Sequence, residues 1–162
     1  MISINCKEKS YTEFVTEDYF PVIVSVNDYV DNISYCEYGC DSKSLLEFTV
    51  NRTNKAFYRM KLILCKKYEK RAEMMTLPDS YIEGTITMDV PDKNSTDTLF
   101  TIIYSDGVEI RLSDKKAVQY YKNGNLYIGI DSNEDLCIVK VSNLSESETE
   151  HVLNELNYQE KD

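Results

Sequence analysis

Residues 99–112 have the sequence LFTIIYSDGVEIRL, and this stretch decides the fold class. Its first six residues are rich in β-branched and aromatic side chains, which favour strands. Asp106-Gly107 comes shortly after them, and Asp-Gly is a strong hairpin signal because both positions tolerate a positive φ. Residues 108–112 then alternate apolar and charged side chains, which is typical of a strand with one buried face. We therefore expect a β-hairpin here.

The same pattern recurs immediately downstream. Residues 118–121 lead into Asn123-Gly124, a second tight-turn signal, and residues 126–130 lead out of it. A polar turn then precedes a further apolar run at residues 136–141. Five short strands in succession predict an antiparallel meander in this half of the chain.

The chain continues with the signature of a helix. Ser145 stands three residues before Glu148, which is the spacing of a capping box. Apolar side chains then recur at helical spacing, at Val152, Leu153 and Leu156. We expect an amphipathic helix over residues 146–157, packed on a face of the sheet.

The first half of the chain predicts further strands at residues 21–26, 45–50 and 81–90. Residues 56–75 allow two interpretations. Alternation of apolar and basic side chains favours a hairpin with 45–50 that ends near Cys65, with a short helical turn after it. A spacing near 3.6 among the apolar residues allows a helix instead. The sequence therefore predicts a single domain, residues 1–162, of the α+β class. It consists mostly of antiparallel β-sheet, with the C-terminal helix packed on it.

No catalytic, cofactor or metal motif is present in the sequence. His151 is the single histidine, which excludes sites that need two, and we expect it on a solvated helix face beside glutamates. The pair Cys36 and Cys40 lacks a second pair with which to complete a four-ligand metal site. The five glycines are scattered, so no phosphate-binding loop is formed. We therefore expect no enzyme activity, no catalytic residue, no cofactor and no metal.

The cysteines and the N-terminus indicate a cytoplasmic protein. The count of five cysteines is odd, and the N-terminal residues MISINCKEKS lack the basic and apolar regions of a signal peptide. No apolar run is long enough to span a membrane. We expect five reduced thiols, with Cys65 and Cys137 buried in apolar strands.

Charge is the feature that points most directly to a function. The net charge is −10, and residues 10–42 contain seven acidic residues, no Lys or Arg, and several tyrosines. Residues 43–71 invert this balance with nine basic residues. An acidic surface repels nucleic acid and attracts a basic protein, and tyrosine is common at protein interfaces. The candidate partner-binding residues are Asp28, Tyr29, Asp31, Tyr35, Glu37 and Asp41.

Two stretches also resemble a known class of proteins. They are LLEFTV at residues 45–50 with KLILCKKY at 61–68, and LYIGID at 126–131 with IVKVSNLS at 138–145 before an acidic helix. Together they resemble small acidic immunity proteins of bacterial polymorphic or contact-dependent growth inhibition toxin systems. The resemblance implies a cytosolic protein that occludes the active site of a toxin domain, often a cationic nuclease.

Two further functions remain open. One is a small ligand-binding or enzymatic α+β domain with a pocket on the sheet face, and the other is a self-assembling structural subunit. The sequence does not specify the oligomeric state.

Overall fold

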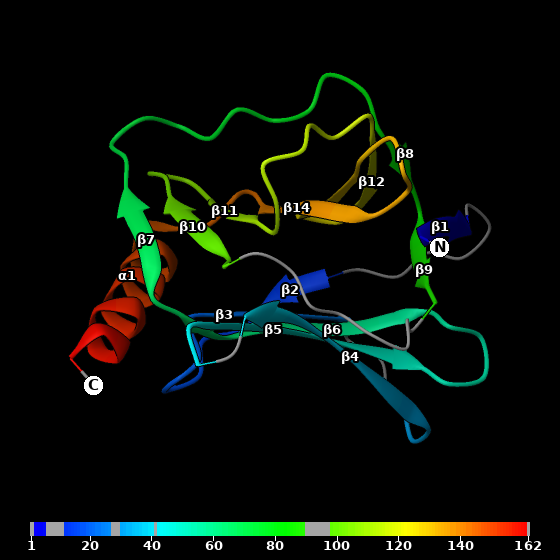
Figure 1. Ribbon diagram of the computed structural model, residues 1–162, viewed down its shortest axis with the longest axis horizontal. Helices are drawn as coiled ribbons and strands as arrows, with labels where there is room; N and C mark the ends of the chain where they lie inside the picture. The colour runs from blue at the N-terminus through cyan, green and yellow to red at the C-terminus, as the bar shows by residue number, and fades with distance from the viewer. Residues whose placement is uncertain (1, 6–11, 27–29, 41, 90–97, 162) are drawn as a thin grey trace.

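Two β-sheets lie face to face in the computed structural model, which describes residues 2–5, 12–26, 30–40, 42–89 and 98–161 (Figure 1). The first sheet is antiparallel, with the strand order β2-β3-β6-β5-β4. Its strands are β2 (Thr12–Phe14), β3 (Val22–Val26), β4 (Ile33–Cys40), β5 (Ser44–Asn51) and β6 (Phe57–Cys65).

The second sheet has the strand order β7-β10-β11-β14-β13-β12-β8. Only its two edge pairs, β7 with β10 and β8 with β12, are parallel. Its strands are β7 (Lys67–Lys70), β8 (Ile82–Glu83), β10 (Phe100–Ile103), β11 (Val108–Arg111), β12 (Gln119–Asn123), β13 (Leu126–Ile130) and β14 (Leu136–Val141).

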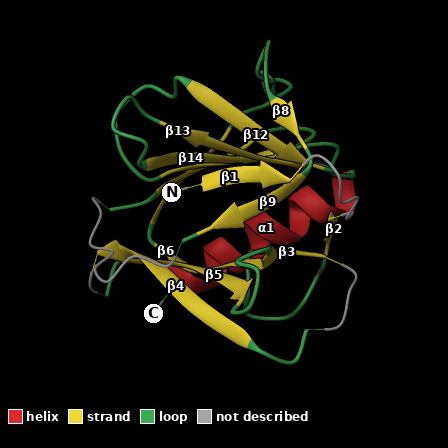
Figure 2. Ribbon diagram, turned by 90° about the vertical axis from the view of Figure 1, so that its right-hand side faces the viewer, coloured by secondary structure: helices red, strands yellow, loops and turns green. Residues whose placement is uncertain are grey.

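A helix and a two-stranded ribbon lie at opposite ends of this sandwich. The ribbon pairs β1 (Ile2–Asn5) with β9 (Thr85–Met88), and the helix α1 spans Glu146–Glu160 (Figure 1). Figure 2, viewed from the ribbon end, places α1 between the levels of the two sheets. Val152 and Leu156 of α1 are fully buried and belong to the core between the sheets.

The core is built from alternate side chains of the facing strands, as the two-residue period of a strand requires. Both sheets and the helix contribute to one continuous apolar cluster. Its fully buried members include Val24, Phe48, Met60, Leu62, Ile110, Ile128 and Val139. The prediction of a mostly antiparallel α+β fold with a C-terminal helix packed on the sheet is therefore confirmed.

The hairpins expected in the second half are also present. β10 pairs with β11 across Asp106-Gly107, and β12 pairs with β13 across a turn in which Gly124 has a φ of 58°. However, β14 lies between β11 and β13, so the five strands do not follow one another across the sheet as in a simple meander. Local turn signals specify each hairpin, but they do not specify which edges of two hairpins join.

Residues 56–75 are in part as expected. β6 pairs antiparallel with β5, so the hairpin is confirmed and the helix is excluded. The expected helical turn after Cys65 is wrong, because residues 67–70 form β7, parallel to β10. The expected strand at 81–90 is two short strands, β8 and β9, separated by Gly84. Val90 lies outside the described residues.

The start of the helix and the burial of two cysteines agree with the predictions from the sequence. α1 begins with the expected capping box, in which the Glu148 amide donates to Ser145 Oγ and the Ser145 amide donates to Glu148 Oε1. Cys65 and Cys137 are buried, as expected. Cys36 is buried as well, whereas Cys6 and the side chain of Cys40 lie outside the description.

Candidate functional site

The two sheets differ in what covers the side that faces away from the core. On the second sheet, residues 71–81 run across that side as a strap (Figure 1). No described helix or strand lies across the corresponding side of the first sheet, which we call the outer face (Figure 1). Its side chains come from strand positions that alternate with core positions. They include Glu13, Ile23, Ser25, Tyr35, Glu37, Glu47, Thr49, Arg59 and Lys61.

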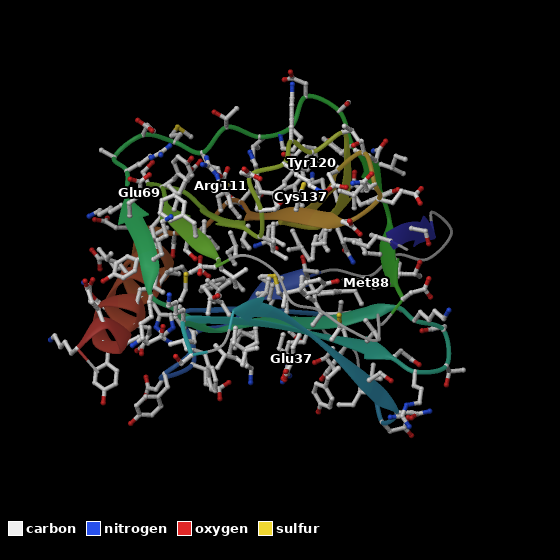
Figure 3. The ribbon with its side chains drawn as sticks, in the orientation of Figure 1. Glu37, Glu69, Met88, Arg111, Tyr120 and Cys137 are labelled. Carbon is white, nitrogen blue, oxygen red and sulfur yellow. The ribbon has the colours of Figure 1, made fainter. Side chains whose placement is uncertain are left out.

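Strand register arranges these side chains in rows across the sheet. One row runs Glu37, Glu47, Lys61 and Ile23, from the β4 edge inward. Figure 3 shows Glu37 on the side of the first sheet that faces away from the second. Two carboxylates are therefore direct cross-strand neighbours, an arrangement that destabilises a sheet unless a cation lies close by.

The nearest cation in that row does not form an ion pair with them. Lys61 Nζ lies 4.2 Å from the centroid of the Phe20 ring, in a cation–π contact. Among the described residues, no ion pair includes Glu37 or Glu47. Burial raises the pKa of Glu47 above its usual value, and the charge of Glu37 also raises it, whereas the charges of Lys61 and Arg59 both lower it. This end of the row therefore carries negative charge that no ion pair neutralises.

The neighbouring row joins Tyr35, Thr49, Arg59 and Ser25. Tyr35 is 55% exposed at the β4 edge, and Thr49 beside it is buried. The Arg59 guanidinium lies 5.2 Å from the centroid of the Tyr58 ring. Its Nε is buried and has no hydrogen-bond partner in the described part of the chain. The outer face thus combines an exposed aromatic ring, an acidic edge and an unsatisfied donor.

Three of the six residues expected to bind a partner can be placed. Tyr35 and Glu37 are exposed on the outer face, two positions apart on β4. Asp31 is exposed just before that strand begins. Asp28, Tyr29 and Asp41 lie outside the described residues.

Glu47 was missed because it lies in the basic segment of the sequence. Its alternation with buried residues of β5 marks it as outward-facing, but only the register with β4 places it beside Glu37. Arg59 and Lys61, which alternate with apolar residues in the sequence of β6, both lie on this outer face.

His151 is less exposed than expected and has a hydrogen-bond partner in another part of the chain. It is half-buried, and its Nε2 lies 3.0 Å from the Phe20 carbonyl oxygen. A carbonyl only accepts, so this nitrogen carries the proton and donates. Glu155 of the same helix accepts from the Tyr19 amide. The helix therefore holds the turn that positions Phe20 over Lys61.

The covered side of the second sheet contains a buried ion cluster. Glu109 pairs with Arg111 at 2.7 Å and with Lys140 at 3.4 Å. Lys140 Nζ also donates to the Thr76 carbonyl of the strap at 2.7 Å. Figure 3 places Arg111 on the side that the strap covers. The hydrogen bond from Lys140 to Thr76 therefore joins this cluster to the strap.

A cleft of about 440 Å³ lies where β7 and β10 meet the first turns of α1. Lys70 and Arg71 line one side, and Glu146 and Glu150 line the other. Arg71 is already paired with Glu69. The cleft lies at the junction of sheet and helix, not on the sheet face where the sequence suggested a pocket, and its lining contains no histidine or cysteine.

The described residues contain no cluster of three or more side chains suited to a metal ion. Within the same residues, no helix has the length and apolar character that a membrane span requires. No protein-family model matches the sequence, and no curated protein is significantly similar to it.

Proposed function

We propose that this protein binds a basic protein partner through the outer face of its first sheet. The observation that carries the proposal is the pair Glu37 and Glu47, adjacent on a face that no described helix or strand covers and without an ion pair among the described residues. A cationic partner would supply the missing countercharges. Tyr35, exposed beside them, offers a ring to pack against that partner.

The resemblance to immunity proteins suggests what the partner is. We propose that it is a toxin domain of a bacterial polymorphic or contact-dependent growth inhibition system. Its basic active site would be covered by the outer face and so closed to its substrate. In this role the protein acts in the cytoplasm by occlusion and needs neither a catalytic residue nor a cofactor.

The reading frames that flank the gene provide the test, because an immunity gene is expected beside its toxin gene. Each flanking product is expressed in bacteria with and without this protein. We expect one product to arrest growth and co-expression to restore it. We also expect the two purified proteins to bind each other.

A variant pair links the result to the outer face. Glu37→Gln with Glu47→Gln should weaken binding about tenfold or more, whereas Glu73→Gln with Asp114→Asn should change it little. The control pair also removes two carboxylates, both exposed, one from the strap and one from the loop after β11. If neither flanking product arrests growth or binds, the toxin assignment is wrong. If both variant pairs weaken binding equally, the outer face is not the site.

A further inference from the structure

The first sheet ends in an open edge at β4. β5 is the only described strand that pairs with β4, and the pairing extends over eight residues, from Ile33 opposite Asn51 to Cys40 opposite Ser44. An unpaired edge of this length is a template on which another strand can pair.

The other sheet edges are shorter or engaged. β2 has three residues, and its Thr12 Oγ1 donates to the Asn123 carbonyl of the second sheet at 2.8 Å. β8 has two residues. β7 has four residues, and its Tyr68 hydroxyl donates to Asn157 of α1 at 2.6 Å. β4 is therefore the edge best suited to accept a further strand.

The register identifies which backbone groups face outward. The Arg52 amide donates to the Asn32 carbonyl at 2.8 Å, so residue 32 forms a hydrogen-bonded pair with residue 52. Hydrogen-bonded and non-hydrogen-bonded pairs alternate along an antiparallel ladder. Even-numbered residues of β4 thus bond to β5, and odd-numbered residues direct their amides and carbonyls to the open edge. No hydrogen bond among the described residues engages the outward backbone groups of Tyr35 or Glu37.

The side chains at these positions define what the edge accepts. Tyr35 and Glu37 lie on the outer face, and the row inward from Glu37 continues to Glu47 and then Lys61. A lysine or arginine beside Glu37 on an added strand would give this row a cation on each side of its two carboxylates. A second copy of this chain would instead bring two such acidic rows together, at a net charge of −10 each.

We infer that β4 accepts an extended segment of the basic protein partner as a sixth strand of the first sheet, with a lysine or arginine beside Glu37. Backbone hydrogen bonds from Tyr35 and Glu37 align the segment, and the Glu37 carboxylate selects its charge. The inference rests on the proposed function and specifies how the partner is held.

A peptide probe tests the inference without knowledge of the partner. The probe is an end-capped eight-residue peptide that alternates lysine and threonine, so that all its lysines share one face of a strand. We expect fast amide hydrogen exchange at Tyr35 and Glu37 in the free protein and slow exchange with millimolar peptide. The amides of Cys36 and Tyr38, bonded to β5, should exchange slowly in both states.

Two matched controls separate strand pairing from charge attraction. The same peptide with alternate amides N-methylated keeps its charge but cannot form the ladder, and it should give no protection. A glutamate–threonine peptide can form the ladder but carries the opposite charge, and it should bind at least tenfold more weakly. Equal protection by the methylated and unmethylated peptides, or no alternation between odd and even residues, would overturn the inference.

Variants of the chain provide an independent measurement. Glu37→Pro and Glu37→Ala both remove the carboxylate, but only proline removes the outward amide. Proline is tolerated at an edge position whose amide faces solvent. We expect Glu37→Ala to weaken binding of the lysine peptide severalfold. We expect Glu37→Pro to abolish the protection of β4 amides from exchange. Equal binding by the two folded variants contradicts strand addition.

The outcomes distinguish this inference from the proposed function. If a flanking product is neutralised but the peptide protects no amide of β4, strand addition is wrong and the proposed function stands. If the peptide adds to β4 but no flanking product binds, the edge is a site for basic strands and the toxin assignment is wrong.

Discussion

Single side chains in this protein have either a structural role or a candidate binding role, and burial separates the two. Glu109 and Lys140 are almost fully buried, and each has its charge compensated within the described structure. Glu37 is exposed without such a partner. Because a buried charge that loses its partner is strongly destabilising, the first pair is where a substitution should affect stability most.

Replacing Lys140 by Met tests that role. Glu109 would keep Arg111 but lose its buried partner, and the Thr76 carbonyl would lose its donor. We expect the free energy of unfolding to fall by about 2–4 kcal/mol in urea denaturation. The control Lys55→Met removes an exposed ion pair with Asp89 and should cost about 1 kcal/mol or less. Equal costs for the two variants would show that the Lys140 pair contributes no more than a surface pair.

Cys137 gives a prediction about reactivity. Burial raises the pKa of its thiol to about 11, and the charge of Asp131 adds to the rise. At pH 8 about 0.1% of such a thiol is ionised, and the thiolate is the reactive form. We expect iodoacetamide to modify Cys137 only slowly in the native protein and rapidly in denaturant, as followed by peptide mass spectrometry. Rapid native modification would show that the sheet around Cys137 opens readily.

At the scale of elements, α1 depends on a cap that the sequence shows directly. Ser145→Ala removes the acceptor for the Glu148 amide and should lower the free energy of unfolding by about 1 kcal/mol. Ser145→Asp supplies another good capping side chain and should cost much less. Urea denaturation of the two variants gives the comparison. If aspartate costs as much as alanine, the cap does not account for the stability at this position.

The elements also differ in how much of them the sequence could predict. The hairpin at 99–112 and the cap at Ser145 are specified by neighbouring residues, so their signals are local. β4 has no apolar run, and it contains Glu37 and Gly39, two residue types that are uncommon in strands. Its strand conformation therefore comes from its eight residue pairs with β5. β7 has good helix-forming residues, yet it is a strand because it pairs with β10, more than thirty residues later.

The candidate site shows the same division between local and long-range information. Tyr35 and Glu37 were identified from an acidic, tyrosine-rich segment. Glu47 lies in a segment with nine basic residues, so it was not identified. The composition of a segment does not distinguish residues that lie on opposite faces of a strand. The register of β4 with β5 brings Glu47 beside Glu37, and that contact is made only in the folded sheet.

For the whole molecule, the question is whether the net charge of −10 or the outer face directs a basic partner. Both attract a cation at long range, but only local charges lie close to the partner at the moment of docking. Arg59 and Lys61 also lie on the outer face, so the attraction of this face for a cation must come from Glu37 and Glu47 at its β4 edge. In α1, Glu148 completes the cap and Glu155 accepts from the Tyr19 amide, whereas Glu146 and Glu150 are exposed.

Association kinetics can distinguish attraction by the net charge from attraction by the outer face. The partner in this measurement is the flanking gene product whose growth arrest this protein relieves. Glu37→Gln with Glu47→Gln should slow association severalfold in 0.01 M salt. The loss should shrink at 0.15 M, because the Debye length falls from about 30 Å to about 8 Å. Tyr35→Ala removes a contact ring and should instead speed dissociation. Glu73→Gln with Asp114→Asn changes the net charge equally but leaves the outer face intact. If this control pair slows association as much, the net charge of the molecule steers the partner, and the acidic edge has no special part in the encounter.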